Sequence, residues 1–270
     1  MSELGQVEGA LPFDIAIVGL GIVGVHQITR EVEETIRRCR HIFVIDPGFG
    51  VVPYLERICA NVTNLIPFYE RGKSRLLTYR RMATAVINAA IVGSPVCFAS
   101  YGHPSVFCYP TELIRRASKL LNLRIETFPG ISSLDTLMVD LGIDFAADGV
   151  QMYEATDLLL RRRPIQTDVA CVLWQTSVLA EPTYETRRRS VEHFLRLQNY
   201  LLEFYPREHS ITLVVSKTFP LLRSLVETYQ LESLAIELER GPQAGTLYIP
   251  PLHRRPIEDH QIFRALSALT

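Results

Sequence analysis

The sequence predicts an α/β fold of two lobes, and three observations carry that prediction. Short apolar runs alternate with helical patterns along the whole chain of 270 residues, which is typical of parallel βαβ units. The pair Pro129-Gly130 falls near the middle and marks a hinge. Hydrophobic residues make up 47% and charged residues 21% of the chain, which argues against disorder. We therefore expect an N-terminal lobe over residues 1–129 and a C-terminal lobe over residues 130–270.

The first lobe is predicted to contain five strands, each a short apolar run. They cover residues 14–18, 42–45, 62–68, 96–101 and 124–128. Helical patterns fill the gaps, at residues 24–38, 75–92 and 110–121.

The same alternation continues in the second lobe and predicts a further α/β unit. Its expected strands cover residues 150–153, 169–174, 211–215 and 246–249. Its clearest helical patterns cover residues 191–204 and 256–266.

Charge usage excludes two classes of partner. Lys and Arg number 28 against 29 Asp and Glu, so a global electrostatic grip on nucleic acid or an anionic membrane is not expected. The basic runs 161–163 and 187–189 have acidic neighbours and are interpreted as solvated surface. Residues 82–111 carry no charge, but Gly93-Ser94-Pro95 and Gly102-His103-Pro104 interrupt them. We expect a buried helix, a turn and a core strand there, not a membrane span.

Cysteine usage indicates a reducing, cytoplasmic compartment. The five cysteines are scattered, odd in number and free of any C-x-x-C pair, so neither a disulfide framework nor a cysteine metal site is expected. The seven histidines show no metal-ligand spacing either. No secretory signal is visible at the start of the sequence.

A glycine-rich turn follows the first predicted strand. Gly19, Gly21 and Gly24 have G-x-G-x-x-G spacing, and Asp46 ends the next strand about 20 residues on, as a dinucleotide fingerprint requires. Glycines would admit a pyrophosphate to a helix N-terminus, and Asp46 would hold ribose hydroxyls. A tight strand-to-helix turn also recruits glycine. Spacing alone leaves both interpretations open.

The most unusual stretch runs from Tyr69 to Tyr79. Its Gly72-Lys73-Ser74 resembles the end of a nucleotide-binding P-loop, but Pro67 stands where that loop needs glycine. Arg75 and Tyr79 are four residues apart and share a helix face, where a guanidinium would favour a phenolate. A surface Arg–Tyr stacking pair is the simpler interpretation of the same spacing.

The whole set of motifs, in order, resembles the tetrapyrrole (corrin/porphyrin) methylase superfamily, and within it the borosin peptide backbone α-N-methyltransferases. The segments that carry the resemblance are Ile17-Val18-Gly19, Val44-Ile45-Asp46-Pro47, Gly72-Lys73-Ser74-Arg75, Thr78-Tyr79, Tyr101-Gly102-His103-Pro104, Pro129-Gly130-Ile131-Ser132, Tyr153-Glu154-Ala155, Asp157-Leu158-Leu159, Arg163-Pro164 and Tyr248-Ile249-Pro250-Pro251. By this resemblance the methylase interpretation comes first and the nicotinamide interpretation becomes an alternative.

The resemblance implies a two-lobed fold with S-adenosylmethionine in the cleft between the lobes. By that resemblance, the cofactor-binding residues are Tyr101, His103, Val106, Ser132, Ser133, Gln175 and Thr246. The glycine turn would form a floor near the cofactor and would not cradle phosphate. No metal is implied.

The resemblance also implies three catalytic residues. Tyr79, with its pKa lowered by Arg75, would act as the base that removes the amide proton. Tyr69 would donate a hydrogen bond to the amide oxygen. The fungal enzymes have a further tyrosine three positions before Tyr69, where this sequence has Ile66.

The resemblance implies a homodimer, and the substrate is expected to be a separate ribosomal precursor peptide, in a heterotetramer with that dimer. The fungal enzymes carry their substrate as a C-terminal extension, whereas this sequence stops at Thr270, soon after Tyr248-Ile249-Pro250-Pro251. Three alternatives stay open: a tetrapyrrole C-methyltransferase, a nicotinamide-binding oxidoreductase, and an inactive scaffold that only binds peptide.

Overall fold

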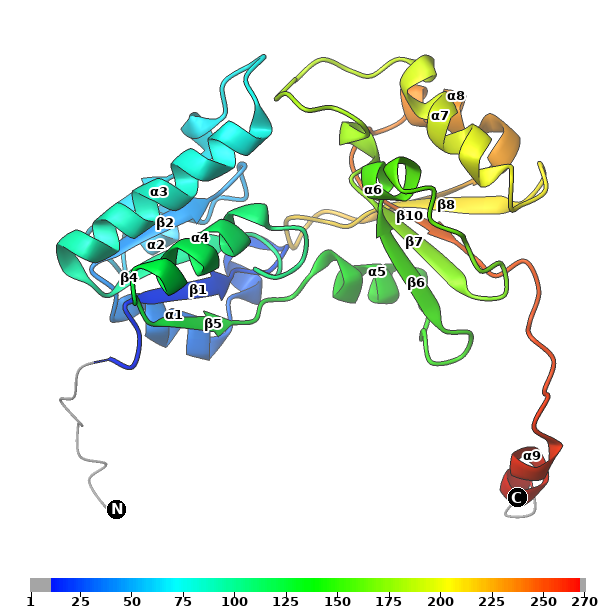
Figure 1. Cartoon of the computed structure of the whole chain (residues 1–270), viewed down its shortest axis with the longest axis horizontal. Coiled ribbons are helices and arrows are strands. Elements are labelled where there is room, and N and C mark those ends of the chain that lie inside the picture. The colour runs from blue at the N-terminus through cyan, green and yellow to red at the C-terminus, as the bar shows by residue number, and fades with distance from the viewer. Residues whose placement is uncertain (1–10, 268–270) are drawn as a thin grey trace. The chain divides into compact units, whose positions relative to one another are not determined.

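The computed structural model describes residues 11–267, which form two compact units (Figure 1). Of the described residues, the first unit comprises 11–140, Ala180–Arg187 and Ser216–Ser224. The second comprises Leu141–Leu179, Arg188–Val215 and 225–267. Two short segments from the later part of the chain thus belong to the first unit.

The first unit is built on a parallel sheet of five strands in the order β3-β2-β4-β1-β5. The strands are β1 (Ile15–Gly19), β2 (His41–Ile45), β3 (Val62–Asn64), β4 (Val96–Ser100) and β5 (Ile125–Phe128). Because β1, β2 and β4 are buried along almost their whole length, they read in the sequence as continuous apolar runs.

Helices cover both faces of this sheet (Figure 1). Ile15 and Ile17 of β1 pack with α3 (Arg75–Gly93) and α4 (Tyr109–Leu120), while Ala16 and Val18 face α1 (Arg30–Arg37) and α2 (Val52–Leu55). This alternation follows from the two-residue period of a strand. Each fully buried isoleucine contributes ~1.5–3 kcal/mol. The helix α5 (Ser133–Leu141) follows β5.

The charge-free stretch folds as the sequence predicts, into a helix, a turn and a core strand. Helix α3 begins after Ser74, whose hydroxyl accepts a hydrogen bond from the Leu77 N–H, and it ends at Gly93 before Pro95. Strand β4 follows directly. Among the described residues, no helix is long and apolar enough to cross a membrane.

The second unit has a mixed sheet of five strands in the order β6-β7-β10-β8-β9. The strands are β6 (Val150–Glu154), β7 (Ala170–Trp174), β8 (Ser210–Val215), β9 (Leu225–Gln230) and β10 (Thr246–Ile249). Within this sheet only β6 and β7 run parallel, and the other pairs are antiparallel. The expectation of parallel units throughout was therefore wrong for this sheet, because β8 and β9 pair antiparallel and β10 lies antiparallel between β7 and β8.

One face of the second sheet packs against three helices (Figure 1). These are α6 (Ala155–Leu160), α7 (Val191–Leu201) and α8 (Leu234–Arg240). A last helix, α9 (His260–Ser267), has no buried residue.

Two elements differ from the sequence prediction. Strand β3 stops at Asn64, because the Asn64 side chain accepts the Ile66 N–H (3.0 Å) and Ile66–Phe68 turns into a 3₁₀ helix containing Pro67. The helix expected directly after the glycine turn is only a 3₁₀ turn, Gly24–Gln27, and α1 begins later at Arg30.

Candidate active site

The carboxyl ends of the parallel strands bring three glycines into backbone contact. Gly19 ends β1, Gly102 follows β4 and Gly130 follows β5. A Cβ placed on Gly19 would lie 2.6 Å from the Gly102 oxygen and 2.7 Å from the Gly130 Cα. Only glycine fits this crossing, so the turn motif has a packing explanation.

The N–H groups of the glycine turn are hydrogen-bonded to other groups of the first unit and are not open to a phosphate. The Ile22 and Val23 N–H groups donate to Oε1 of Gln27 (2.6 and 2.9 Å). Gly21 and Gly102 exchange backbone hydrogen bonds of 3.3 and 2.8 Å. The N–H groups that a pyrophosphate needs are therefore occupied within the unit.

Asp46 is occupied in the same way. Its carboxylate accepts four backbone N–H groups from the turn after β2, those of Gly48 (3.1 Å), Phe49 (2.6 Å), Val51 (2.9 Å) and Val52 (3.2 Å). The side chain is buried, with 7% exposure. It shapes this turn and has no free face for ribose hydroxyls, so the geometry argues against the dinucleotide interpretation.

Five of the residues expected to bind the cofactor lie after β4 and β5 in the first unit. Tyr101 is 47% exposed and its ring meets Phe49 edge-on at 5.6 Å. Nδ1 of His103 accepts the Ser105 N–H (3.1 Å), which leaves Nε2 as the protonated nitrogen of the neutral ring. The Val106 N–H donates to the His103 carbonyl (3.1 Å), closing this turn.

The two serines mark the beginning of α5. The Ser132 hydroxyl donates to Asp135 (2.6 Å) and accepts the Leu134 N–H (3.2 Å), so it caps the helix. Ser133 is the first helical residue, and its carbonyl accepts the Thr136 hydroxyl (3.2 Å).

The other two expected cofactor residues lie at neighbouring ends of two adjacent inner strands of the second sheet, β7 and β10. Gln175 directly follows β7 and has a left-handed backbone, with φ 60°. Thr246 begins β10, one residue beyond the antiparallel pair Leu247–Leu173, and is buried. A non-glycine residue at positive φ costs of order 1–3 kcal/mol and clusters at functional sites.

The three expected catalytic residues come together in the first unit. Arg75 and Tyr79 lie on the first turns of α3, and Tyr69 comes directly before the loop that leads to this helix. The rings of Tyr69 and Tyr79 meet edge-on with centroids 6.1 Å apart. All three side chains are partly buried.

Burial favours the neutral form of Tyr69. Burial raises the pKa of Tyr69 far above its usual value, the neighbouring Tyr79 raises it further, and the nearby Arg75 guanidinium opposes the shift. Tyr69 is therefore a protonated hydrogen-bond donor at any physiological pH.

Arg75 holds an unused donor. Its Nε–H is buried and has no hydrogen-bond partner in the described structure. A buried donor without a partner costs about 1–3 kcal/mol, so such a group marks a place where a ligand oxygen would be stabilised.

Sequence reasoning missed two further tyrosines here. The ring of Tyr184 lies 4.8 Å from that of Tyr69, and the ring of Tyr109 lies 6.1 Å from that of Tyr79. We call Tyr69, Tyr79, Tyr109 and Tyr184 the tyrosine cluster. Tyr184 comes from the Ala180–Arg187 segment of the first unit, so no local pattern could have identified it.

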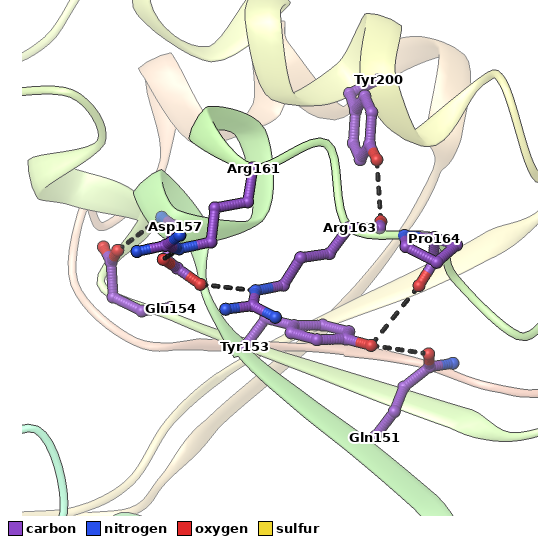
Figure 2. Close-up of polar contacts among 8 residues, drawn as sticks. All are labelled: Gln151, Tyr153, Glu154, Asp157, Arg161, Arg163, Pro164 and Tyr200. Carbon is purple, nitrogen blue, oxygen red and sulfur yellow. Dashed lines mark hydrogen bonds and ion pairs between the residues drawn. The ribbon is translucent and has the colours of Figure 1, made fainter.

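A second polar cluster surrounds α6 in the second unit (Figure 2). The Asp157 carboxylate pairs with Arg161 (2.7 Å) and Arg163 (2.6 Å), which lowers its pKa, and Glu154 caps the helix by accepting the Asp157 N–H (2.8 Å). The Tyr200 hydroxyl donates to the Arg163 carbonyl (2.8 Å). These contacts fix the turn after α6, so this cluster is structural.

The second basic run is also structural in part. The Arg188 guanidinium donates to the last carbonyls of α8, those of Glu239 (2.5 Å) and Gly241 (2.7 Å) among them. Arg189 is buried and exchanges backbone hydrogen bonds with the Gln243 side chain (2.6 and 2.7 Å). The solvated-surface interpretation was therefore wrong for Arg189, which is buried and tied to Gln243. Arg188 is exposed, in line with that interpretation, and its guanidinium also binds carbonyls at the end of α8.

Neither disulfides nor a metal cluster are found in the part of the chain that the structure describes. All five cysteines are free thiols, and burial raises the pKa of Cys171 to about 12. No group of three or more His, Cys, Asp or Glu among residues 11–267 is arranged to hold a metal ion.

Comparison with known proteins gives a family match and two kinds of relative. The family model of the tetrapyrrole (corrin/porphyrin) methylases matches residues 14–217. The methyltransferase/ribosomally synthesized cyclic peptide omphalotin A precursor of Omphalotus olearius is 30% identical over 260 residues, 94% of this chain and 61% of that protein. The corresponding gymnopeptides precursor of Gymnopus fusipes is 29% identical over 241 residues, 88% of this chain and 57% of that protein. The chain thus spans 57% and 61% of the lengths of these two relatives.

Solved structures agree on the fold. The methyltransferase CobJ matches with a TM-score of 0.65 and 17% identity, covering 90% of this chain and 96% of that chain. A uroporphyrin-III-C-methyltransferase from Thermus thermophilus matches with a TM-score of 0.61 and 18% identity, covering 88% of this chain and 91% of that chain. At these identities the likeness concerns the fold alone, and it confirms the fold class expected from the sequence.

Proposed function

The chain belongs to the tetrapyrrole (corrin/porphyrin) methylase family of methyltransferases, and from that premise we propose that it α-N-methylates backbone amides of a separate precursor peptide. The methyl donor in this proposal is S-adenosylmethionine. The observation that carries the proposal is the cluster of Tyr69, Arg75 and Tyr79, in which a buried Nε–H of Arg75 has no partner among the described residues.

The chemistry of an amide explains why such a cluster is needed. The amide nitrogen is a weak nucleophile because its lone pair is delocalised into the carbonyl group. Methylation therefore requires removal of the N–H proton and stabilisation of the negative charge that develops on the oxygen.

We assign the two roles to different tyrosines. Tyr79, on the same helix face as Arg75, takes the amide proton. Tyr69, kept protonated by burial, donates a hydrogen bond to the amide oxygen, and one such donor contributes ~3–4 kcal/mol in comparable sites. Arg75 Nε–H is a second donor for the same charge.

The proposed cofactor residues offer groups that suit a sulfonium nucleoside. Tyr101, a half-exposed residue, presents an aromatic ring, and His103 presents Nε2. The glycine crossing presents a backbone without side chains. Val106, Ser132, Ser133, Gln175 and Thr246 complete the proposed set. The bound cofactor supplies an electrophilic methyl group, and alignment of the amide nitrogen with it contributes as much as ~7–11 kcal/mol.

The likeness to the relatives supports a peptide as the substrate. The printed names of the two fungal relatives combine a methyltransferase with a cyclic peptide precursor. We propose that here the precursor is another polypeptide, bound by a homodimer of this chain. Docking of the precursor would raise the effective concentration of its tail to about the mM range.

The test combines the purified protein, S-adenosylmethionine and the product of a neighbouring short reading frame. Intact-mass spectrometry should show the precursor gaining single methyl masses, which fragmentation places on backbone nitrogens. Uroporphyrinogen III serves as the competing substrate. Methyl groups found only on that tetrapyrrole, or only on this chain, would contradict the proposal.

A further inference from the structure

A segment distant in sequence supports the loop of the candidate catalytic tyrosine. Residues Ala180–Arg187, here called the strap, pair antiparallel with the residues before α3. The Gly72 N–H donates to the Tyr184 carbonyl (2.9 Å), and the Tyr184 N–H donates to the Lys73 carbonyl (2.9 Å). The Arg75 N–H donates to the Pro182 carbonyl (3.0 Å).

The supported loop has few contacts of its own. Between Tyr69 and α3, the Lys73 N–H donates to the Glu70 carbonyl (3.0 Å). Gly72 has φ +75°, and a Cβ added to it would find no atom within 4 Å. The strap therefore supplies the backbone pairing that fixes this loop.

The strap is itself held in shape. The Glu181 carboxylate accepts both the N–H (3.1 Å) and the hydroxyl (2.6 Å) of Thr183. Glu185 pairs with Arg71 at 3.5 Å, across 114 residues of chain. The residues directly before and after Tyr184 are thus both held by side-chain contacts.

The Tyr184 side chain lies against the proposed hydrogen-bond donor. Its ring centroid is 4.8 Å from that of Tyr69, with the planes tilted by 38°. Tyr79 meets another side of Tyr69 edge-on. Ile66, where the resemblance expects one more tyrosine, is partly buried and packs against the core of the first unit.

We propose that Tyr184 is a positioning residue for amide methylation, whose ring holds Tyr69 in the orientation that lets its hydroxyl reach the substrate oxygen. This inference rests on the function proposed above. The ring carries the effect, because the contact with Tyr69 is between the two tilted rings and the backbone of Tyr184 is fixed by its own hydrogen bonds. The hydroxyl of Tyr184 is not required.

The test compares Tyr184→Leu with Tyr184→Phe. A misplaced donor lowers kcat by about 10- to 100-fold, so we expect this decrease in kcat for Tyr184→Leu. Its affinity for S-adenosylhomocysteine and its KM for the precursor should stay within about twofold of the wild-type values. Tyr184→Phe should keep nearly the full rate. Thr186→Ala, exposed on the same strap, is the matched control and should behave as the wild type.

Two outcomes would overturn the inference. One is wild-type turnover by Tyr184→Leu, and the other is an equal loss in Tyr184→Phe, which would make the hydroxyl the acting group. Should Tyr184→Leu fail to fold, Tyr184→Met tests the same loss of the ring.

A spectroscopic readout separates this inference from the proposed function. In protein labelled with fluorotyrosine, the ¹⁹F signal of Tyr69, assigned with Tyr69→Phe, should shift in Tyr184→Leu. A wild-type protein that methylates no peptide would refute the proposed function, while the ¹⁹F experiment would still report the ring contact. An unchanged Tyr69 signal in Tyr184→Leu would refute the positioning role by itself.

Discussion

The glycine turn and the tyrosine cluster lie in the same unit, and they treat their polar groups in opposite ways. In the glycine turn, the Ile22 and Val23 N–H groups bind Gln27, and the Asp46 carboxylate accepts four backbone N–H groups. Beside the tyrosine cluster, the buried Nε–H of Arg75 has no partner in the described structure.

This difference separates a motif that builds the fold from one that is free to bind a ligand. The glycine turn has the spacing of a dinucleotide fingerprint, yet its hydrogen bonds are satisfied internally. The stretch from Tyr69 to Tyr79 matches no complete general motif, yet it holds a buried unsatisfied donor, Nε–H of Arg75. Hydrogen-bond accounting thus distinguishes the two where spacing does not.

The largest expected effect concerns the tyrosine cluster. Arg75→Ala and Tyr79→Phe should each lower the methylation rate by about 10²- to 10⁴-fold, because each removes a group that acts on the charge or proton of the amide. Initial rates by mass spectrometry and calorimetry with S-adenosylhomocysteine measure the two effects separately.

The cofactor affinity of both variants should stay near that of the wild type. Arg80→Ala, an exposed arginine on the same helix, is the matched control and should keep full activity. Wild-type turnover by Tyr79→Phe would show that Tyr79 is not the base. It would also weaken the contrast between the glycine turn and the tyrosine cluster.

The next largest effect is on stability, at the glycine turn. Gly19→Ala should cost about 3 kcal/mol or more, since its Cβ would meet only backbone atoms, at 2.6 and 2.7 Å. Gly72→Ala is the comparison, because its Cβ has free space and only its positive φ opposes the change, at about 1 kcal/mol. Urea unfolding measures both, and equal losses would show that the glycine crossing is less tight than described.

Asp46→Asn sharpens the same comparison. Replacing one carboxylate oxygen by an NH₂ group turns an acceptor of backbone N–H groups into a donor, so unfolding should become easier by about 1–3 kcal/mol. The wild type should show no saturable NADH binding in a fluorescence titration. Tight NADH binding that Asp46→Asn abolishes would restore the dinucleotide interpretation.

The smallest expected effect depends on pH and lies outside both regions. Hydrogen bonds from the Arg124 side chain and N–H lower the pKa of Asp14 from 3.8 to about 2. A lowered carboxyl pKa stabilises the fold above about pH 4, and this contribution is lost as the pH falls towards 2. Arg124 is 54% exposed, so solvent reduces the contribution to about 1 kcal/mol.

Urea unfolding of Asp14→Asn and of the wild type at several pH values measures the contribution of the Asp14–Arg124 ion pair. The difference in unfolding free energy should be present at pH 7 and shrink below pH 4. A difference that persists unchanged at pH 2.5 would assign the effect to packing and not to the ion pair.

The first sheet was predictable from the sequence, and the second only in part. Strands β1 and β4 are buried on both faces and read as apolar runs. Strand β9 was missed because its residues alternate between half-buried and exposed positions, with Val226 44% exposed. Strand direction in the second sheet is set by tertiary connections, which no local pattern encodes.

The candidate site was predictable only where its residues are neighbours in the chain. Arg75 and Tyr79 are one helical turn apart, so their shared face follows from helix geometry. The place of Tyr184 beside Tyr69 depends on the antiparallel pairing of two distant segments. The hydrogen bonds that the Asp46 carboxylate accepts likewise depend on the conformation of the following turn, which residue spacing does not determine.

The strap also bears on the order in which the molecule folds. The contact between Arg71 and Glu185 spans 114 residues, whereas α3 and α4 form within a short stretch of chain. Such distant pairings close large loops and form late, after local elements have assembled. During synthesis or refolding, the first sheet can therefore consolidate around β1 and β4 before Tyr69 acquires its partner. The candidate site is then completed among the last steps, so an early folding intermediate would carry the sheet without an ordered tyrosine cluster.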